Sequence, residues 1–302
     1  MGKAPKVQVL MSTYNGEKYL VEQLQSILKQ DYSNLCILIR DDGSTDNTLQ
    51  ILDEYSRLDE RIKYYQSANI GAKRSFFELI NNADPLSDYY ALSDQDDVWN
   101  TNKISRAINK LIINGDKPLL YCCDTLLVNE KLEPMNNSIR KPLIKPSFGN
   151  ALIENICTGC TCVFNRDLLY LVQNNEPNFA IMHDWWLYLC ASAYGEVIYD
   201  SQPNVLYRQH GNNIVGARSN YYDEFKIRLY NYKTNRGKLY SQVNEFASKF
   251  QFNNQNRKQI ELIICSKSNM MSRLRIIFNK KIYRQRKIDD IIFKVLLASR
   301  KI

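Results

Sequence analysis

The chain has 302 residues, of which 44% are hydrophobic and 24% charged, and such a composition is typical of a soluble globular protein. Its length suits one large domain, or one domain with an appendage. No apolar run approaches the roughly 20 residues of a membrane span, and the start of the chain lacks the apolar segment of a secretory signal, so we expect a cytoplasmic protein.

Positive charge is concentrated towards the C-terminus. Residues 221–302 contain 19 Lys and Arg against 6 Asp and Glu, a balance of +13, whereas residues 1–220 contain 21 against 26, a balance of −5. We therefore expect one domain over residues 1–220 and a basic extension over residues 221–302. Such an asymmetry favours an anionic partner, either lipid head groups or nucleic acid.

The eight cysteines lack the regular spacing of a disulfide scaffold and lie mostly in apolar surroundings, so we interpret them as reduced core residues. Cys157, Cys160 and Cys162 form a CxxCxC cluster. No second pair and no nearby histidine completes a zinc set, and we therefore assign this cluster to a buried strand.

Apolar strands alternate with amphipathic helical patterns over the first part of the chain. In chain order, the sequence predicts a strand at 7–12, a helix over 17–29, a strand at 36–40, a helix through 49–52, a strand at 62–66, a helix over about 72–82, a strand at 89–92 and a helix from about 101. This alternation predicts a parallel sheet with helices on both faces. Ligands of such sheets bind outside the carboxyl ends of the strands.

Three carboxylates, Asp94, Asp96 and Asp97, follow the strand at 89–92 in the run YYALSDQDDVW. Their mutual repulsion calls for a nearby cation. Asp94 and Asp96, spaced i and i+2, can project to the same side of an extended segment and offer oxygens to Mg²⁺ or Mn²⁺. The run therefore predicts a metal–diphosphate site, although an acidic turn that caps the next helix is an alternative.

Other polar residues end strands at the same edge. Ser12, Asp41 and Asp42 follow the strands at 7–12 and 36–40, and the chain has neither a Walker A loop nor a GxGxxG run. The run NIGAKRSF places Lys73 and Arg74 in the first turn of a helix, where their charges and the free backbone amides could meet a diphosphate. A solvated basic helix start explains the same pattern.

Both histidines of the chain stand in later polar runs, His183 in HDWWLYLCASAYG and His210 in YRQHGNN. Asp184 opens a helix beside aromatic residues, which raises a carboxyl pKa into the range suited to taking a proton, although a helix cap is a compatible interpretation. Trp185 or Trp186 could stack on a sugar ring, or pack in the core. His210 could complete a metal shell or bind a diphosphate.

Four ordered motifs resemble those of the inverting nucleotide-sugar glycosyltransferases of family 2. They are STYNGEKYL (12–20), IRDDGSTDNT (39–48), NIGAKRSF (69–76) and SDQDDVW (93–99), and the resemblance extends from residue 7 to about 215. The runs at 183–195 and 207–213 resemble the bacterial rhamnosyltransferase-like branch, whose members build capsular, O-antigen or cell-wall polysaccharides. The resemblance implies an α/β fold of the GT-A (Rossmann-like) type, a mostly parallel central sheet flanked by helices. Residues 221–302 lie beyond the resemblance, and their apolar and basic residues at roughly helical spacing predict a helical basic C-terminal extension.

The resemblance also implies a role for each matching residue. It assigns Ser12, Thr13 and Tyr14 to the base of the nucleotide, Asp42 to the N3–H of uracil or thymine, Asp94 to base and ribose, Asp96 to the metal and Asp184 to the general base. Asp41 is then structural and Asp97 a cap. Arg74 and His210 help to neutralise the leaving diphosphate, His210 as a metal ligand, and Trp185 or Trp186 binds the acceptor.

The implied reaction is one in-line displacement that inverts the anomeric centre, with Mn²⁺ or Mg²⁺ as cofactor. Our best assignment is L-rhamnose transfer from dTDP-rhamnose onto a bacterial surface polysaccharide or lipid-linked acceptor. UDP-glucose or UDP-galactose is the alternative donor. The basic extension either docks on the inner leaflet or packs back on the body. A non-catalytic membrane-binding or nucleic-acid-binding protein is the rival from another class, with nucleic acid the less expected partner.

Overall fold

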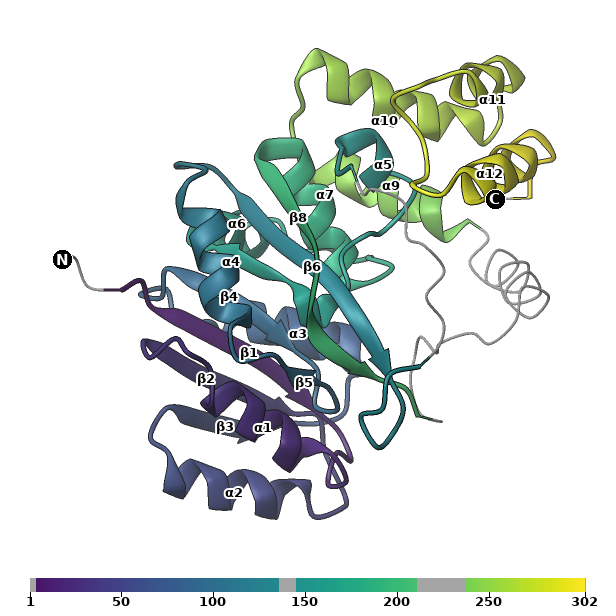
Figure 1. Cartoon of the computed structure of the whole chain (residues 1–302). Coiled ribbons are helices and arrows are strands. Elements are labelled where there is room, and N and C mark those ends of the chain that lie inside the picture. Colours follow the sequence, from purple (N-terminus) through teal and green to yellow (C-terminus); the bar gives the residue numbers. More distant parts are fainter. Residues whose placement is uncertain (1–3, 136–144, 211–236, 302) are drawn as a thin grey trace.

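The computed structural model of the chain describes residues 4–135, 145–210 and 237–301. Its centre is a mixed sheet of eight strands among these residues, in the order β3-β2-β1-β4-β7-β6-β8-β5 (Figure 1). The strands are β1 (Val7–Thr13), β2 (Leu35–Asp41), β3 (Ile62–Gln66), β4 (Tyr89–Ser93), β5 (Val98–Trp99), β6 (Leu119–Val128), β7 (Val163–Asn165) and β8 (Glu196–Arg208).

The first four strands form a parallel half-sheet, as the sequence predicts. β1 pairs with β2 and β4, and β2 pairs with β3, all in parallel. The connecting helices are α1 (Leu20–Leu28), α2 (Thr48–Leu58) and α3 (Ala72–Asn81). Every residue of β1 except Ser12 is buried, because helices cover both faces of the sheet. The register places Thr13 opposite Asp41, so the polar ends of β1 and β2 meet at one edge.

The second half of the sheet mixes strand directions. β7 is antiparallel to β4 and β6, β8 is parallel to β6, and the short β5 is antiparallel to β8. Four of these seven pairings in the described chain are parallel, which agrees with the predicted mostly parallel sheet. The β5–β8 pairing matters for the site because it carries the chain from the acidic turn at 94–97 alongside the end of β8.

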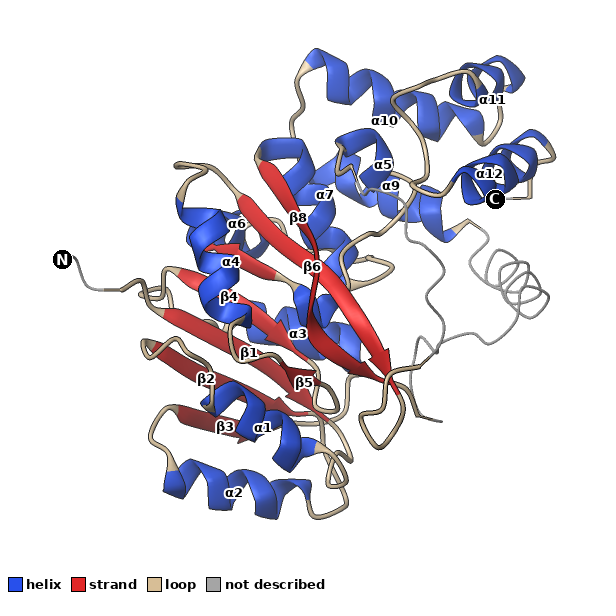
Figure 2. Cartoon of the chain, in the orientation of Figure 1, coloured by secondary structure: helices blue, strands red, loops and turns tan. Residues whose placement is uncertain are grey.

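Helices cover the two faces of the sheet with separate apolar clusters (Figure 2). On one face, Leu24 of α1 and Ile104 of α4 (Lys103–Ile112) pack with Val9 and Met11. On the other face, Phe76 of α3 packs with α6 (Arg166–Gln173) and α7 (His183–Tyr194). A short helix, α5 (Phe148–Ala151), and a 3₁₀ turn, η1 (Gly159–Thr161), lie between β6 and β7 in the chain.

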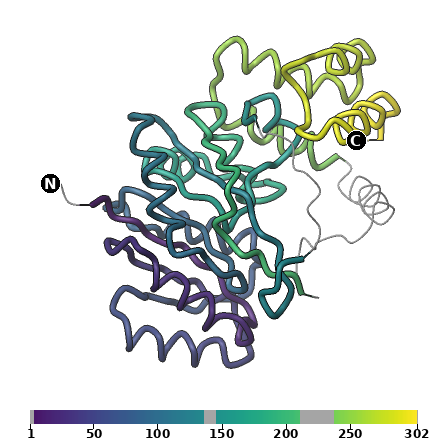
Figure 3. The backbone as a smooth tube through the Cα atoms, viewed as in Figure 1, coloured from purple at the N-terminus to yellow at the C-terminus, as the bar shows by residue number. Residues whose placement is uncertain are grey.

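The described part of the C-terminal extension is helical. It comprises α9 (Lys238–Lys249), α10 (Asn254–Ser266), α11 (Met270–Ile277) and α12 (Lys287–Ala298), which gather at one end of the molecule in Figure 3. Phe246 of α9 and Phe293 of α12 belong to the same apolar cluster as Trp186 of α7. These helices therefore pack back on the body, one of the two expected arrangements. The expected domain boundary at 220/221 lies outside the described residues.

Membrane spans and disulfide bonds can be checked only over the described ranges. None of the helices there combines the length and apolar character needed to cross a bilayer. All eight cysteines carry free thiols, and six are buried as predicted, but Cys265 is exposed and Cys36 is half-buried. The Cys157–Cys162 cluster is buried in a loop and the η1 turn, so the prediction of a strand there was wrong.

Candidate active site

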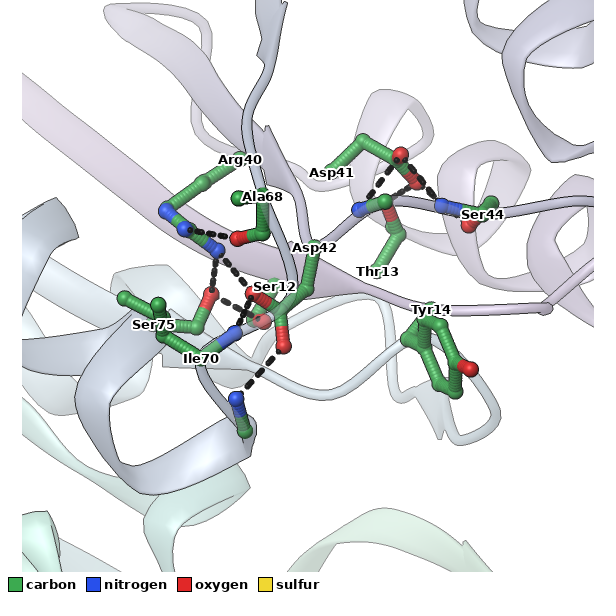
Figure 4. A network of polar contacts seen from close by, with 12 residues as sticks. Ser12, Thr13, Tyr14, Arg40, Asp41, Asp42, Ser44, Ala68, Ile70 and Ser75 are labelled. Carbon is green, nitrogen blue, oxygen red and sulfur yellow. Dashed lines mark hydrogen bonds and ion pairs between the residues drawn. The ribbon is translucent and has the colours of Figure 1, made fainter.

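Asp42 stands at the end of β2 within a buried polar network (Figure 4). Its Oδ1 accepts a 2.5 Å bond from Nη1 of Arg40 and a 2.9 Å bond from the amide of Ile70, and its Oδ2 accepts from the amide of Gly71 at 2.9 Å. Arg40 also donates to Oγ of Ser75 and to the carbonyl of Ala68. Each carboxylate oxygen has two lone pairs, so Oδ2 retains capacity for one more donor.

Ser12, Thr13 and Asp41 occupy the adjoining ends of β1 and β2. Oγ of Ser12 lies 2.6 Å from Oγ of Ser75, at the edge of the Asp42 network. Thr13 is buried and donates its hydroxyl to Oδ2 of Asp41 at 3.0 Å, while Asp41 also accepts from the amide of Ser44. The Thr13 side chain is therefore enclosed in the fold, as is the Asp42 carboxylate at 2% exposure, and the assignment of the segment 12–14 to the nucleotide base stays a prediction. Asp41 has the expected structural role.

Tyr14 follows Thr13 and is 48% exposed, so its ring is open to a flat ligand. In Figure 4 the ring lies on the same side of β1 as the Asp42 carboxylate. The Tyr14 backbone is held by Gln95, whose Oε1 accepts from the Tyr14 amide at 2.8 Å and whose Nε2 donates to the Tyr14 carbonyl at 2.9 Å. A Cβ on Gly16 would lie 2.3 Å from Oε1 of Gln95, so this contact requires glycine at position 16.

Arg74 and Lys73 lie in the first turn of α3, as predicted, and both contact the segment before α7. Nη1 of Arg74 lies 3.3 Å from Oε1 of Glu176 in an exposed ion pair, and Nζ of Lys73 donates to the carbonyl of Ala180 at 2.8 Å. Exposed pairs contribute only about 0–1 kcal/mol to the free energy of folding. A dianionic ligand can therefore recruit the Arg74 guanidinium from Glu176.

The acidic turn after β4 gathers its carboxylates around one point. Oxygens of Asp94 and Asp97 and Sγ of Cys160 all lie within 4.8 Å of one another. Burial, followed by the charges of Asp97, Asp96 and Asp184, raises the pKa of Asp94 well above its usual range. Burial, followed by the charge of Asp96, raises the pKa of Asp97 to about 7.

Asp97 is not a helix cap, and this corrects our expectation. It is fully buried, and its Oδ1 accepts from the backbone amide of Arg208 on β8 at 3.1 Å, while Asn102 is the N-cap of α4. Its Oδ2 has no hydrogen-bond partner among the described residues. Lys103 is buried nearby, with Nζ 3.2 Å from the centroid of the Trp99 ring. Its positive charge partly offsets the rise in the pKa of Asp97.

Asp96 and His210 meet although they lie far apart in the sequence. Nε2 of His210 is 2.8 Å from Oδ2 of Asp96, and the two side chains are 11% and 21% exposed. The His210 ring also packs 5.1 Å from the ring of Tyr19, centroid to centroid. The structure thus brings together the two residues that the sequence assigns to the metal.

Arg208 connects this pair to the rest of the site. It is buried, its Nε donates to the carbonyl of Asp96 at 2.8 Å, and its Nη2 forms an ion pair with Glu22. Nη1 donates to the carbonyl of Glu130, and the guanidinium lies over the Tyr19 ring. Arg208 therefore holds the acidic turn in place from inside the fold, rather than facing a ligand.

The donor atoms at the acidic turn fit a divalent cation. Mg²⁺ and Mn²⁺ take carboxylate oxygens, and two ligands of one octahedral ion at about 2.0–2.1 Å lie about 3 Å apart. The 2.8 Å contact between the Asp96 oxygen and the His210 nitrogen is a hydrogen bond, and it holds both atoms within reach of one ion. The buried Oδ2 of Asp97 has no hydrogen-bond partner among the described residues, and a cation at the turn would offset the burial and the neighbouring charges that raise the pKa of Asp94.

Asp184 lies in the first turn of α7 and is nearly fully buried. Burial raises its pKa to about 6, an effect limited by hydrogen bonds from the amide of Trp185, the side chain of Asn155 and the amide of Gly159. Its Oδ1 accepts from the Trp185 amide at 2.7 Å. The η1 turn lies between Asp184 and the acidic turn, since Gly159 lies beside Asp184 and Sγ of Cys160 lies within 4.8 Å of oxygens of Asp94 and Asp97.

His183 supports Asp184 from the core. Its ring stacks on Phe76 with centroids 4.1 Å apart, and burial lowers its pKa to about 3, so the ring is neutral. A Cβ on Gly159 would lie 3.0 Å from Nε2 of His183 and 3.7 Å from Oδ2 of Asp184. A side chain at position 159 would therefore press on the His183 ring, while its distance to Asp184 would be an ordinary van der Waals contact.

The two tryptophans after Asp184 have different surroundings. Trp186 is 0% exposed and packs edge-on against Phe246, so its ring cannot stack on a sugar, and the expectation of acceptor binding is corrected for this residue. Trp185 is half-buried, and its Nε1 donates to the carbonyl of Ala151 at 2.7 Å. Trp185 keeps surface that an acceptor could contact.

Sequence reasoning missed several residues that shape the site. Gln95 was overlooked between two aspartates, and only the Asn-Gly pair at 15–16 signalled a close backbone approach there. Arg208 stands in the run YRQHGNN, but the sequence does not reveal that it is buried and contacts the backbone of Asp96 and Glu130 from inside the fold. Gly159 and Ser75 carried no recognisable signal, because their importance comes from neighbours distant in sequence.

Comparisons with known proteins agree with this geometry. The sequence model of the family described as "Glycosyl transferase family 2" matches residues 8–171. The chain is 33% identical over 262 residues to the "dTDP-rhamnosyl transferase RfbG" of Shigella flexneri, covering 81% of this chain and 87% of that protein. It is 30% identical over 192 residues to the "UDP-Glc:alpha-D-GlcNAc-diphosphoundecaprenol beta-1,3-glucosyltransferase WfgD" of Escherichia coli, covering 61% of this chain and 68% of that protein.

Solved structures share the fold at low sequence identity. The mannosyltransferase PcManGT of Pyrobaculum calidifontis, solved in complex with GDP-Man and Mn²⁺, superposes with a TM-score of 0.56 at 16% identity. The superposition covers 89% of this chain and 72% of that one. This likeness extends to the C-terminal part of the chain, beyond the region matched by the family model, and it concerns the fold alone.

Proposed function

Because the chain belongs to glycosyl transferase family 2 and is therefore a glycosyltransferase, we propose that it transfers L-rhamnose from dTDP-L-rhamnose onto a hydroxyl of a growing bacterial surface polysaccharide or lipid-linked acceptor. The predicted family, fold and enzyme class are confirmed. Family membership also removes the rival interpretation of a non-catalytic membrane-binding or nucleic-acid-binding protein.

One observation carries the proposed chemistry: the acidic turn and a second buried carboxylate converge from opposite halves of the chain. Asp96 and Asp94 come from the turn after β4, whereas Asp184 comes from α7. The η1 turn links the two, because Gly159 lies beside Asp184 and Sγ of the next residue, Cys160, lies within 4.8 Å of oxygens of Asp94 and Asp97. Carboxylates that approach one turn from two sides, one set for the leaving group and one for the acceptor, suit an inverting transfer.

We assign the nucleotide to the ends of β1 and β2. Asp42 would accept the N3–H of the base through the remaining capacity of its Oδ2, and the Tyr14 ring would stack on the base. Ser12 lines the same edge, and Asp94 lies next to the expected ribose. Arg74 lies in the first turn of α3, where the helix N-terminus favours anions, and it would bind the diphosphate.

Asp184 acts as the general base in the proposed mechanism. A pKa of about 6 leaves it mostly ionised at neutral pH, yet basic enough to accept the proton of the acceptor hydroxyl. The acceptor oxygen then bonds to the anomeric carbon while the bond from that carbon to the diphosphate oxygen breaks on the opposite side. The configuration inverts, and a β-linked donor gives an α-L-rhamnoside. Trp185 would line the acceptor side.

The donor set at Asp96 and His210 would hold Mn²⁺ or Mg²⁺, and a divalent ion bound there supplies positive charge against the diphosphate leaving group. Arg208 keeps the Asp96 backbone in place, and the buried Asp97 anchors the turn to β8. These residues thus pre-organise the site before the donor arrives.

UDP-glucose or UDP-galactose is the alternative donor within the same family. The similarity to a glucosyltransferase whose name specifies UDP-Glc favours this alternative, although the identity and coverage are lower than for the dTDP-rhamnosyl transferase. A panel of dTDP-rhamnose, UDP-glucose, UDP-galactose and GDP-mannose, tested for thermal stabilisation of the protein with Mn²⁺, separates the two. We expect the largest stabilisation from dTDP-rhamnose. A larger shift with a UDP-sugar would replace our donor assignment.

A further inference from the structure

We propose that the outer face of α11 and α12 docks on an anionic phospholipid bilayer. This surface, the α11–α12 face, combines exposed apolar side chains with a surrounding excess of positive charge. Six exposed apolar residues define this face, and they are Met271, Leu274, Phe278, Ile288, Ile291 and Val295.

The apolar residues form one stripe on each helix. Leu274 and Phe278 are four positions apart at α11, and Ile288, Ile291 and Val295 follow a spacing of three and four along α12. Residues at these intervals share one face of a helix. The opposite faces are also apolar, since Ile276 and Phe293 are buried in the core.

A helix that packs on a protein normally presents a polar face to water. Here Phe278 is 81% exposed, Ile291 58% and Val295 61%. Isolated exposed apolar residues are ordinary, but several on adjoining helices mark an interaction surface. α11 and α12 are consecutive and in contact, so the two helices that carry the stripes lie side by side.

The positive charge around the two apolar stripes favours an anionic bilayer as the partner. Residues 267–301 contain 11 Lys and Arg against 2 Asp and Glu, a balance of +9. Lys267, Arg275, Lys280, Lys281 and Lys287 are all exposed. Aliphatic side chains beside lysine and arginine match a bilayer, where the apolar groups enter the acyl boundary and the cations meet lipid phosphates. Nucleic acid would use the charges but offers no acyl layer for Ile291 and Val295.

In Figure 2 the arrowheads of β1, β2 and β6 point to the lower right of the view, whereas α11 and α12 lie at the upper right. The α11–α12 face is thus separate from the sheet edge that carries the site. The docking proposal does not depend on which donor sugar the enzyme uses.

Flotation of the full chain with phosphatidylcholine vesicles, with and without phosphatidylglycerol, tests the proposal. We expect the protein to float only with the anionic vesicles. The variant Phe278→Ser/Ile291→Ser should reduce the floating fraction at least tenfold. Its matched control, Leu58→Ser/Ile113→Ser, removes two apolar side chains of similar exposure from the body, 74% and 79%, and should float like the parent chain.

Charge is tested separately with Arg275→Glu/Lys280→Glu against Lys29→Glu/Lys63→Glu, which changes net charge equally at exposed sites on the body. Only the first pair should abolish flotation. Hydrolysis of the sugar nucleotide should be the same in all four variants, which shows that each is folded and that its donor site is intact.

Three results would overturn the proposal. The first is equal flotation of the α11–α12 variants and their controls. The second is a dimer, seen by light scattering without vesicles, that Phe278→Ser/Ile291→Ser dissociates, because the face would then be a contact between two copies. The third is salt-sensitive retention on DNA that Arg275→Glu/Lys280→Glu removes, without any flotation of the parent chain. Loss of donor binding would contradict the proposed function but leave these readouts unchanged.

Discussion

Nε2 of His210 lies 2.8 Å from Oδ2 of Asp96, although 114 positions separate the two residues. β8 carries the chain to His210, and its pairing with β5 places that strand end beside the acidic turn. No pattern in the sequence around Asp96 or His210 predicts that these two residues contact each other. Their meeting therefore depends on the whole second half of the sheet.

The first prediction concerns metal binding at this pair. Asp96→Asn and His210→Ala should each weaken Mn²⁺ binding, measured by calorimetry with dTDP present, and Asp96→Asn should lower transfer about 10²- to 10³-fold, because charge stabilisation of the leaving group is lost. Removal of metal with a chelator should have the same effect on the parent chain. Asp116→Asn, at an exposed position, is the control. Unchanged Mn²⁺ affinity in Asp96→Asn would remove this residue from the metal site.

The second prediction concerns the pH dependence of transfer. Burial raises the pKa of Asp184 to about 6, and the proposed base works only when ionised. The value of kcat/KM should therefore be constant above this pKa and fall as the pH decreases through about 6. Asp184→Asn should lower the rate about 10²- to 10⁴-fold and leave a residual rate without this acid limb. A retained limb, or near-normal turnover, would show that another group takes the proton. The affinity for dTDP serves as the control and should not change.

The third prediction concerns the loop that presents Tyr14. Gln95→Ala removes two hydrogen bonds to the Tyr14 backbone, each contributing about 0.5–1.5 kcal/mol. The donor KM should rise about tenfold with a smaller change in kcat, because the effect is on binding. Gly16→Ala should act in the same direction, since the new methyl group would displace the Gln95 amide.

Gln25→Ala is the matched control for this loop, because Gln25 makes a single exposed hydrogen bond to Tyr55. Steady-state kinetics with a fixed acceptor provide the measurement. If the donor KM of Gln95→Ala equals that of Gln25→Ala, then the Gln95 bridge does not position Tyr14 for the nucleotide.

The strands and helices of the first half could be predicted because each leaves a local pattern. The buried run VQVLMS and the repeated Leu and Ile of the segment after Glu17 are visible without knowledge of distant residues. β3 matches its predicted bounds, 62–66, and β1, β2 and β4 match within one residue at each end. The order of strands β7, β6 and β8 was not predictable, since it is set by long-range pairing.

The sequence also did not reveal how deeply individual residues of the site are buried. Asp97 follows Asp96 directly, yet it is buried against β8, while the Asp96 side chain is 21% exposed and contacts His210. Trp185 and Trp186 differ in the same way, because successive residues of a helix point in different directions. Local motifs thus located the site but did not separate ligand contacts from the side chains that support them.

The fourth prediction separates the two tryptophans. Trp186→Ala should lower the free energy of unfolding by about 3–5 kcal/mol, because it empties a core position beside Phe246. Trp185→Ala removes a half-buried ring and one hydrogen bond to Ala151, so its loss of stability should be smaller. The acceptor KM should rise for Trp185→Ala at a temperature where the protein is fully folded. An unchanged acceptor KM would exclude Trp185 from the acceptor site.

The fifth prediction concerns the buried ion pair beneath the nucleotide edge. Arg40→Met leaves the Asp42 carboxylate buried without its cation, a change that typically costs about 3–5 kcal/mol of stability. Arg57→Met is the matched control, because Arg57 pairs with Asp53 on an exposed helix surface, where such pairs contribute about 0.3–0.5 kcal/mol. Urea unfolding of both variants gives the comparison.

Binding of dTDP by Arg40→Met then tests how the pair serves the site. Asp42 still accepts hydrogen bonds from the amides of Ile70 and Gly71, so its position is only partly secured without Arg40. We expect weaker dTDP binding together with lower stability, because the same carboxylate links the fold to the base. A variant that lost stability but bound dTDP like the parent chain would show that Arg40 acts in folding alone, and that the amides of Ile70 and Gly71 are enough to position Asp42.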